Sequence, residues 1–368
     1  MRAVQVISPT GPADVVVHDV PEPEPKPGEV LVEVRSVGIS FPDLLLSKGE
    51  YQLKPELPFT LGVDFAGVVV SGPDGYEPGQ RVAGVGGWGG GAELVANPAD
   101  STFLLPDNIS FDEGAALPMN YLTAQFALAE RGQLRAGETV LIHGAAGGVG
   151  TASIQVAKGY GARTIAVVST DEKAAIAKAA GADETVLVHG AAGGVGTATI
   201  QVAKGYGART IAVVSTEEKA AIARRAGADE AVLLEGFRES VKEMTGGRGV
   251  DVVVDVVGGD VFTDSLRSLA TQGRLLVVGF AAGQGIPEVK VNRLLLNNVD
   301  VRGVGWGAFA MMRPGYMQQQ WAELLPMMES GVIKPPIGAT YDLADFGRAL
   351  VDMEDRRTLG KSVVKVRG

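Results

Sequence analysis

The sequence predicts an α/β protein, in which a doubly wound parallel sheet accompanies a β-rich domain within 368 residues. Two observations predict the sheet. Residues 138–183 read as strand, glycine-rich turn, helix, strand and helix, and residues 184–229 repeat this unit with five differences. After the repeats, strands rich in valine, isoleucine and leucine alternate with helical segments. This alternation is typical of parallel sheets covered on both faces.

The first segment predicts the β-rich domain. Over residues 1–105, short runs such as RAVQV, EVLVEVRSVGI and DFAGVVV alternate apolar and polar residues, and proline- and glycine-rich clusters such as PEPEPKPGE separate them. From Phe111 onward the apolar residues take helical spacing, with Asp112 and Glu113 in the opening turn. We therefore expect a barrel-like set of short strands followed by a helix.

The remaining elements follow the two repeats. We expect strands in AVLLE, VDVVVDVVG and RLLVVGFAAG, and helices in FRESVKEMTGG and in residues 264–272. The closing LGKSVVKV is expected to be a strand that rejoins the first domain. The predicted domains are residues 1–122, residues 123–305 with both repeats, and residues 306–368 as the return to the first domain. The second copy would either enlarge the parallel sheet or leave one copy extruded from it.

Composition narrows the function classes. The net charge of −10 and the lack of lysine or arginine runs argue against nucleic acid as a partner and favour small molecules. The chain has no cysteine and three scattered histidines, so we expect no metal. It has no signal pattern and no apolar run near the ~20 residues that span a bilayer, so we expect a cytoplasmic protein without membrane contact.

A glycine-rich turn in each repeat predicts nucleotide binding. In VLIHGAAGGVGTASIQVA, a strand runs into Gly147, Gly148, Val149 and Gly150 and then into a helix. Small residues let the backbone approach a pyrophosphate, whose charge meets the free amides and positive end of the helix. The alternative is a close-packed turn without a ligand. The second copy places the same motif at Gly193, Gly194, Val195 and Gly196.

The end of the next strand predicts which nucleotide is bound. Ser169 and Thr170 stand where an NAD-specific fold would place an acidic residue on the ribose hydroxyls, so their presence favours NADPH. Lys173, at the start of the following helix, could meet a 2′-phosphate, although two neighbouring carboxylates oppose this and a solvated helix lysine is the alternative. Ser215 and Lys219 hold the corresponding places in the second copy.

Several further motifs identify a family. They are VGISFPDLLLSKGEYQLKPELPFTLGVDFAGVV, GAALPMNYLTAQFAL, GETVLIHGAAGGVG, VDVVVDVVGG, RLLVVGFAAG and LGKSVV. With them the chain resembles the medium-chain dehydrogenase/reductase superfamily, specifically its zinc-independent quinone oxidoreductase (zeta-crystallin-like) branch. The resemblance implies a GroES-like catalytic domain, a Rossmann domain, and hydride transfer from NADPH to a quinone or an α,β-unsaturated carbonyl. Zinc-dependent relatives carry cysteine and histidine ligands where this chain has GISFPD and GVDFAG.

The resemblance also implies site residues. Those of the substrate site are the catalytic residues Ser40, Tyr51 and Thr123, with Phe41, Asp43 and Asn120 beside them. Those near the nicotinamide are Gly279, Phe280 and Ala281. Two departures from the family weaken polar contacts to a quinone oxygen: many relatives have asparagine at Ser40 and tyrosine at Leu45. Tyr51 is a candidate acid or a packing residue, and Asp43 is expected to be structural.

Three functions compete. The leading one is an NADPH-dependent reductase of quinones or enones, and its enzymatic rival is an enoyl-thioester (acyl-CoA) reductase, which a basic entrance for CoA phosphates would favour. The third is a nucleotide-binding structural protein, or a duplication variant with impaired catalysis. The resemblance further implies a homodimer formed through the last strand of the nucleotide domain, around NNVDVRGVGW.

The repeat predicts one NADPH per chain. In a doubly wound sheet the nucleotide lies where the winding reverses, because only there do the loops at the strand ends diverge into a crevice. The strand that ends at His143 is expected to take this place beside VDVVVDVV, with the second copy adding strands beyond it on the same side. In the alternative arrangement, the first copy is extruded and the second occupies the central place.

Overall fold

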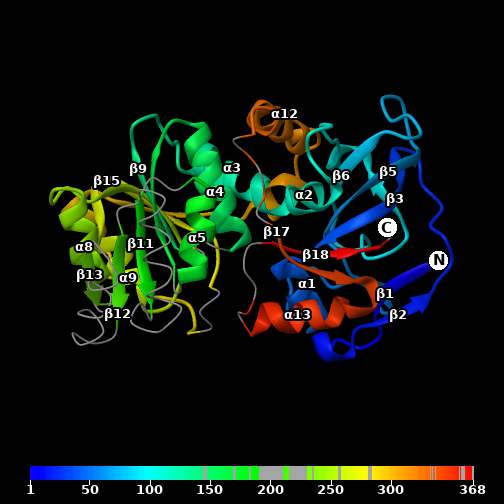
Figure 1. Cartoon of the computed structure of the whole chain (residues 1–368), viewed down its shortest axis with the longest axis horizontal. Coiled ribbons are helices and arrows are strands. Elements are labelled where there is room, and N and C mark those ends of the chain that lie inside the picture. The colour runs from blue at the N-terminus through cyan, green and yellow to red at the C-terminus, as the bar shows by residue number, and fades with distance from the viewer. Residues whose placement is uncertain are drawn as a thin grey trace. The chain divides into compact units, whose positions relative to one another are not determined.

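The chain divides into two compact units, Met1–Leu122 with Phe309–Gly368, and Thr123–Ala308. This computed structural model describes residues 1–143, 147–168, 171–181, 184–189, 210–214, 230–233, 236–255, 258–280, 284–331, 333, 335, 337–355, 357 and 361–366. Figure 1 traces both units along the chain. None of the described helices is long and apolar enough to cross a membrane.

The first unit contains the β-rich region. Its seven-stranded sheet has the order β17-β18-β3-β5-β6-β8, with β7 also paired to β3, and a three-stranded sheet has the order β2-β1-β4. The strands are β1 (Arg2–Val6), β2 (Val16–Asp19), β3 (Glu29–Gly38), β4 (Phe59–Thr60), β5 (Asp64–Ser71), β6 (Arg81–Val85), β7 (Leu94–Pro98), β8 (Thr102–Leu104), β17 (Ile337–Asp342) and β18 (Lys361–Lys365). Because β18 pairs antiparallel with β3, the C-terminal segment completes the first unit, as expected.

Helices pack around these strands. They are η1 (Pro12–Asp14), α1 (Phe41–Ser47), η2 (Ala99–Ser101), α2 (Phe111–Ala116), η3 (Pro118–Leu122), α12 (Tyr316–Glu329), η5 (Leu343–Asp345) and α13 (Phe346–Glu354). Alternating residues of β3 are buried, and Val32 and Val34 join Phe65 of β5 and Phe346 of α13 in one apolar core. Helix α2 begins at the expected residue, where Ser110 and Glu113 form a capping box.

The second unit holds a fully parallel eight-stranded sheet of order β13-β12-β11-β10-β9-β14-β15-β16. Its strands are β9 (Thr139–His143), β10 (Arg163–Val167), β11 (Glu184–His189), β12 (Thr210–Val214), β13 (Glu230–Leu233), β14 (Val250–Asp255), β15 (Leu269–Val277) and β16 (Asp300–Gly303). Its described helices are α3 (Thr123–Gln125), η4 (Phe126–Arg131), α4 (Gly148–Gly159), α5 (Asp171–Ala179), α8 (Phe237–Met244), α9 (Val261–Arg267) and α10 (Asn292–Asn297), and α11 (Trp306–Met311) crosses the unit boundary.

The strand order places the two repeats. Strand β9 of the first copy lies beside β14, with Val140 opposite Val252 and Ile142 opposite Val254. Strands β10 to β13 follow one another on the other side of β9. The prediction that the first copy takes the central place is therefore confirmed, and the alternative with an extruded first copy is wrong. The second copy enlarges the sheet.

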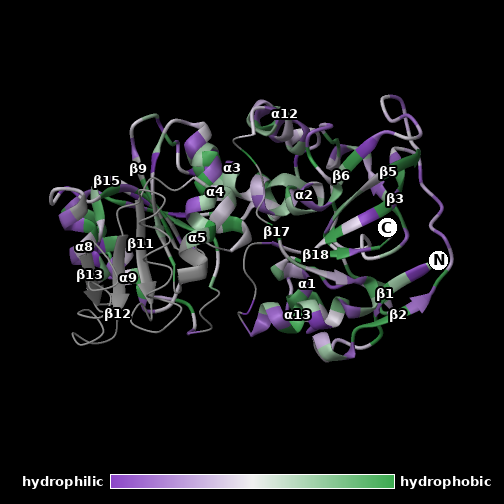
Figure 2. Cartoon of the chain, viewed as in Figure 1, coloured by the Kyte–Doolittle hydropathy of each residue, from purple (hydrophilic) through white to green (hydrophobic). Residues whose placement is uncertain are grey.

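The enlarged sheet requires a long return from β13 to β14, which passes four intervening strands at ~4.8 Å each. Helix α8 makes part of this return. The helix is predominantly hydrophilic (Figure 2), and its buried described side chains are Phe237, Ser240 and Val241. After Met244 the chain leaves the helix through glycines with positive φ, of which Gly249 lies so close to β15 that an added Cβ would be 2.6 Å from the Ser268 oxygen.

Candidate active site

The first feature of the site is the helix that follows β9. Helix α4 begins after Gly147, whose backbone is extended (φ −82°, ψ 174°) and which is exposed. The first amides of a helix have no acceptor within it, and their end carries a partial positive charge. The Thr151 hydroxyl donates to the carbonyl oxygens of Gly147 and Gly148, so it does not occupy these amides. The arrangement can bind an anion.

The second feature is the position of this helix in the sheet. Strand β9 has β10 on one side and β14 on the other, and the order of strands along the chain reverses between them. Loops that follow strands on the two sides of such a switch point diverge, and nucleotides bind there. The predicted residues Gly147, Gly148, Val149 and Gly150 open α4 at this point. Strand β11 of the second copy lies between β10 and β12, on one side of the reversal.

Several predicted cofactor residues fall outside the described residues. They are Ser169, Thr170, Ala281, Gly193, Gly194, Val195, Gly196, Ser215 and Lys219. Lys173 is the third residue of α5, which follows β10, so its backbone lies at the start of that helix, as expected. Its side chain is outside what the structure describes.

The described residues that follow β14 and β15 contact one another. Asp255 ends β14, is fully buried, and accepts the Gly258 N–H on Oδ1 at 2.9 Å. Its carbonyl oxygen accepts the Val278 N–H at 2.9 Å, directly before the predicted residues Gly279 and Phe280. Gly258 has φ +67°, and a Cβ on it would lie 2.8 Å from the Phe280 ring. Asp255 therefore fixes the loop that carries the predicted nicotinamide contacts, a role that the sequence analysis missed.

The first unit contains a buried polar cluster, Ser40–Asp64–Lys361, at the start of α1. Ser40 is 3 % exposed, Asp64 0 % and Lys361 5 %. The Ser40 hydroxyl donates to Asp64 Oδ2 at 2.7 Å, and Lys361 Nζ donates to Ser40 Oγ at 2.5 Å and to Asp64 Oδ2 at 3.0 Å. The other Asp64 oxygen accepts the Met119 N–H at 2.9 Å.

Strand register explains how distant residues reach this cluster. Gly38 of β3 lies opposite Asp64 of β5 and Val363 of β18, and continuing the second register brings Lys361 beside Ser40. A Cβ on Gly38 would be 2.1 Å from the Ala115 oxygen and 3.0 Å from Lys361 Cε, so glycine there leaves room for the lysine stem. Sequence reasoning found Ser40 and missed Asp64 and Lys361, although both stand inside the quoted motifs GVDFAG and LGKSVV.

Asp43 has the structural role that was expected. It is fully buried and accepts the N–H groups of Ser40 (3.1 Å), Gly62 (2.9 Å) and Val63 (3.2 Å). Burial raises the pKa of Asp43 to about 7, while the N–H groups of Gly62 and Ser40 lower it. The carboxyl group thus caps α1 and fixes the loop before β5.

Tyr51 is partly buried against the core of the first unit. Burial raises the pKa of its phenol, and the nearby charge of Asp43 raises it further. The phenol is therefore protonated at neutral pH and can donate a hydrogen bond. Asn120 is buried and donates to the Ala116 oxygen at 3.2 Å, and Thr123, also buried, begins α3 of the second unit.

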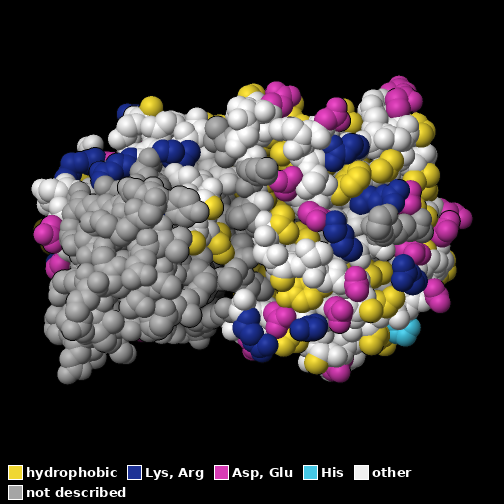
Figure 3. All heavy atoms as spheres, in the orientation of Figure 1, with side chains coloured by type: hydrophobic (Ala, Val, Ile, Leu, Met, Phe, Trp, Pro, Cys, Tyr) yellow, Lys and Arg dark blue, Asp and Glu magenta, His cyan; other side chains and the backbone are white. Residues whose placement is uncertain are grey.

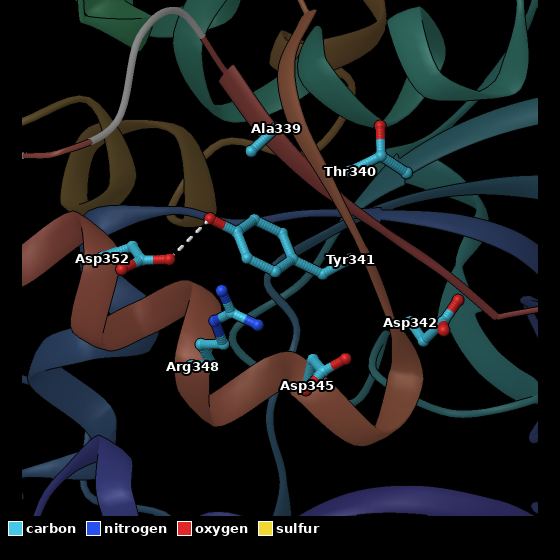
Figure 4. A pocket seen from close by; sticks show the side chains of 7 residues that line it. All are labelled: Ala339, Thr340, Tyr341, Asp342, Asp345, Arg348 and Asp352. Atoms are coloured by element: carbon cyan, nitrogen blue, oxygen red, sulfur yellow. Dashed lines mark hydrogen bonds between the residues drawn. The ribbon is translucent and has the colours of Figure 1, made fainter.

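Two surface hollows lie elsewhere on the first unit. One of about 380 Å³ is shown in Figure 4, where the Tyr341 hydroxyl donates to Asp352 Oδ2 at 2.9 Å beside Arg348. The other, of about 530 Å³, is lined by residues that include Phe59, Trp88 and Glu56. Neither contains a predicted site residue. Among the described residues no group of three acidic or histidine side chains could hold a metal ion.

Comparison with known proteins agrees with this geometry. Residues 148–191 and 194–330 match the family model "Zinc-binding dehydrogenase", and residues 26–107 match "Alcohol dehydrogenase GroES-like domain". Quinone oxidoreductase-like protein 2 of Bos taurus is 33 % identical over 96 % of this chain and 89 % of its own length.

Solved structures give the same result. A mycobacterial protein complexed with NADPH is 32 % identical with a TM-score of 0.79, and each chain is covered fully. The Escherichia coli quinone oxidoreductase complexed with NADPH is 27 % identical with a TM-score of 0.74, again over the whole of both chains. The predicted resemblance is confirmed: the chain belongs to the medium-chain dehydrogenase/reductase superfamily, among its quinone oxidoreductase-like members.

Proposed function

We propose that the chain is an NADPH-dependent, zinc-independent reductase that transfers hydride to a quinone or an α,β-unsaturated carbonyl. The observation that carries this proposal is the glycine-opened N-terminus of α4 at the switch point between β9 and β14. Two structural relatives are NADPH complexes, one of them a quinone oxidoreductase. These relatives support both the cofactor and the reaction class.

The residues present fit this cofactor. The amides of Gly147–Gly150 would hold the pyrophosphate, because their helix end is polarised and the exposed Gly147 has no side chain to block approach. Ser169, Thr170 and Lys173 are the proposed contacts to the 2′-phosphate. Gly279, Phe280 and Ala281 are the proposed wall beside the nicotinamide, which supplies the hydride.

For the substrate we propose Ser40, Tyr51 and Thr123 as the polar contacts. A carbonyl oxygen gains negative charge as hydride reaches the substrate, and hydrogen-bond donors directed at it stabilise this charge. The protonated phenol of Tyr51 is one such donor. The Ser40 hydroxyl is another once its proton turns away from Asp64.

Zinc independence is supported by the residue that contacts the GISFPD and GVDFAG segments, which is Lys361. The Lys361 ammonium lies between Ser40 of the first and Asp64 of the second. The buried ammonium would repel a divalent cation placed beside it, and this repulsion is large because the interior screens charge weakly. We therefore expect chelators to leave activity unchanged.

We further propose a single NADPH per chain and a homodimer. The single site follows from the sheet order, which gives a switch point to β9 and none to β11. The dimer is supported by β16, an edge strand that pairs with β15 alone in the sheet order. Helix α10 precedes β16 in the sequence, and its Leu295 and Leu296 side chains are each about three-quarters exposed. A second copy of the chain would cover them.

A simple assay separates the competing functions. The protein is mixed with NADPH and a simple quinone, then an enone, then an enoyl-CoA, and loss of NADPH absorbance is followed. We expect turnover with the quinone or enone. Turnover with enoyl-CoA alone would establish the rival reductase. Basic residues at the entrance would favour that reductase, because CoA carries phosphates. On the visible face of the first unit, basic and acidic side chains are interspersed (Figure 3). Binding of NADPH without any turnover would establish a nucleotide-binding protein.

A further inference from the structure

The buried cluster Ser40–Asp64–Lys361 places an ion pair against a serine hydroxyl. All three side chains lie within 5 % of full burial, and each hydrogen bond in the cluster involves a charged partner. A serine beside a lysine suggests a nucleophile and its base, but the base would have to be a neutral amine. Lys361 Nζ instead forms an ion pair with the Asp64 carboxylate at 3.0 Å, so this reading fails.

The hydrogen bonds of the cluster allow the Ser40 hydroxyl hydrogen to turn away from Asp64. The Ser40 oxygen accepts a hydrogen bond from Lys361 Nζ, and the Ser40 hydroxyl donates one to Asp64 Oδ2. If this hydrogen turns toward a substrate oxygen, the Ser40 oxygen still has its bond from Lys361. Asp64 still has its bonds from Lys361 and from the Met119 N–H. One hydrogen bond is exchanged for another, and no buried charge is left without a partner.

Resting on the function proposed above, we infer that Lys361 is a positioning residue which keeps the Ser40 proton transferable to the substrate and then replaces it. The substrate receives two electrons and one hydrogen as hydride from NADPH, which leaves a negative charge on its oxygen. The Ser40 hydroxyl gives its proton to this oxygen and takes one from Lys361 Nζ. The neutral amine then takes up a proton from water, so that NADPH, one proton and the substrate are consumed.

The same strand ladder provides a matched comparison cluster. Lys365 lies opposite Ser36 in the register of β18 and β3, four residues from the Lys361 position. Both Lys365 Nζ and Ser36 Oγ contact Asp112 Oδ1 at 2.5 Å. The Lys365 side chain, however, is 42 % exposed, and neither Lys365 nor Ser36 is a proposed substrate contact. Lys365→Met therefore removes a lysine of the same type without touching the proposed site.

The experiment compares Lys361→Met, Lys361→Arg and Lys365→Met. With NADPH and a quinone, Lys361→Met is expected to lower kcat by about 100-fold, the lower range for loss of a general acid. NADPH affinity, measured by fluorescence, should not change. The solvent deuterium isotope effect on kcat should increase in Lys361→Met, because proton delivery becomes rate-limiting. Lys365→Met should keep the rate and the isotope effect of the unmodified protein.

The Lys361→Arg variant separates the effect of a positive charge at position 361 from the delivery of a proton to Ser40. Arginine can bond Ser40 and Asp64, but a guanidinium does not give up a proton in proteins. A second readout uses bound 4-nitrophenol, whose colour reports its ionisation without any turnover. Both the unmodified protein and Lys361→Arg should lower its pKa through the positive charge, whereas Lys361→Met should not. Of these three proteins, only the unmodified one should then retain full kcat.

The remaining outcomes test the inference about Lys361 separately from the proposed function. Unchanged kcat, isotope effect and 4-nitrophenol pKa in Lys361→Met would overturn the inference. Absence of turnover in the unmodified protein, with the 4-nitrophenol shift intact, would refute the proposed function while leaving the charge effect of Lys361 supported. If Lys361→Met does not fold, the double variant Asp64→Asn with Lys361→Met removes both charges together and replaces it in all three measurements.

Discussion

Strands β9 and β11 carry almost the same sequence in one sheet, but β9 lies at its switch point and β11 does not. The two differ in sequence only at Ile142, which is Val188 in the second copy. Their neighbours differ far more, since β9 lies between β10 and β14 while β11 lies between β10 and β12. A glycine-rich strand-turn-helix motif alone is therefore not sufficient to create a crevice, and the neighbouring strands decide whether one exists.

The first way to break this comparison is a bulky side chain in each glycine turn. Gly147→Val should weaken NADPH binding at least about 100-fold, or ~2.8 kcal/mol, because the side chain fills the approach of the phosphate to α4. The fold should survive, since the backbone of Gly147 is extended and accepts any residue. Gly193→Val is the matched control and should leave the NADPH affinity unchanged. Titration of tryptophan or NADPH fluorescence measures both, and loss of binding in Gly193→Val alone would reverse the assignment.

The second test sharpens the comparison at the helix that follows each turn. Lys173→Ala should weaken NADPH about tenfold, the loss of one charge-assisted contact worth ~1.4 kcal/mol, and should leave NADH affinity unchanged. Lys219→Ala should change neither affinity. Equal weakening of NADPH and NADH by Lys173→Ala would show that this lysine does not read the 2′-phosphate.

The smallest expected effect comes from deleting a whole copy. Removing residues 184–229 leaves the first copy, and removing residues 138–183 leaves a second copy that differs at five positions. Either deletion shortens the return to β14 by two strands, about 10 Å, and leaves one copy to pair with β14. Both shortened chains should bind NADPH within about threefold of the full chain, as measured by calorimetry. Binding by only one of them would show that the five sequence differences matter more than position.

Much of this arrangement could be predicted from local pattern. The glycine turn, the apolar strands and the direct linker into the first repeat were enough to place β9 beside β14. The cluster of Ser40, Asp64 and Lys361 could not be found in this way. Lys361 reaches Asp64 across 297 residues of sequence through the pairing of β18 with β3, and no local pattern marks such a contact. Asp255 was missed for a related reason, because one of its contacts is with Val278, which follows β15.

The central claim is that strand neighbours, and not motif copies, set the number of nucleotide sites. Calorimetric titration of the full chain with NADPH tests it most directly. The sheet order predicts one NADPH per chain. A stoichiometry of two per chain would contradict the claim, because it would require a functional crevice beside β11 as well as beside β9.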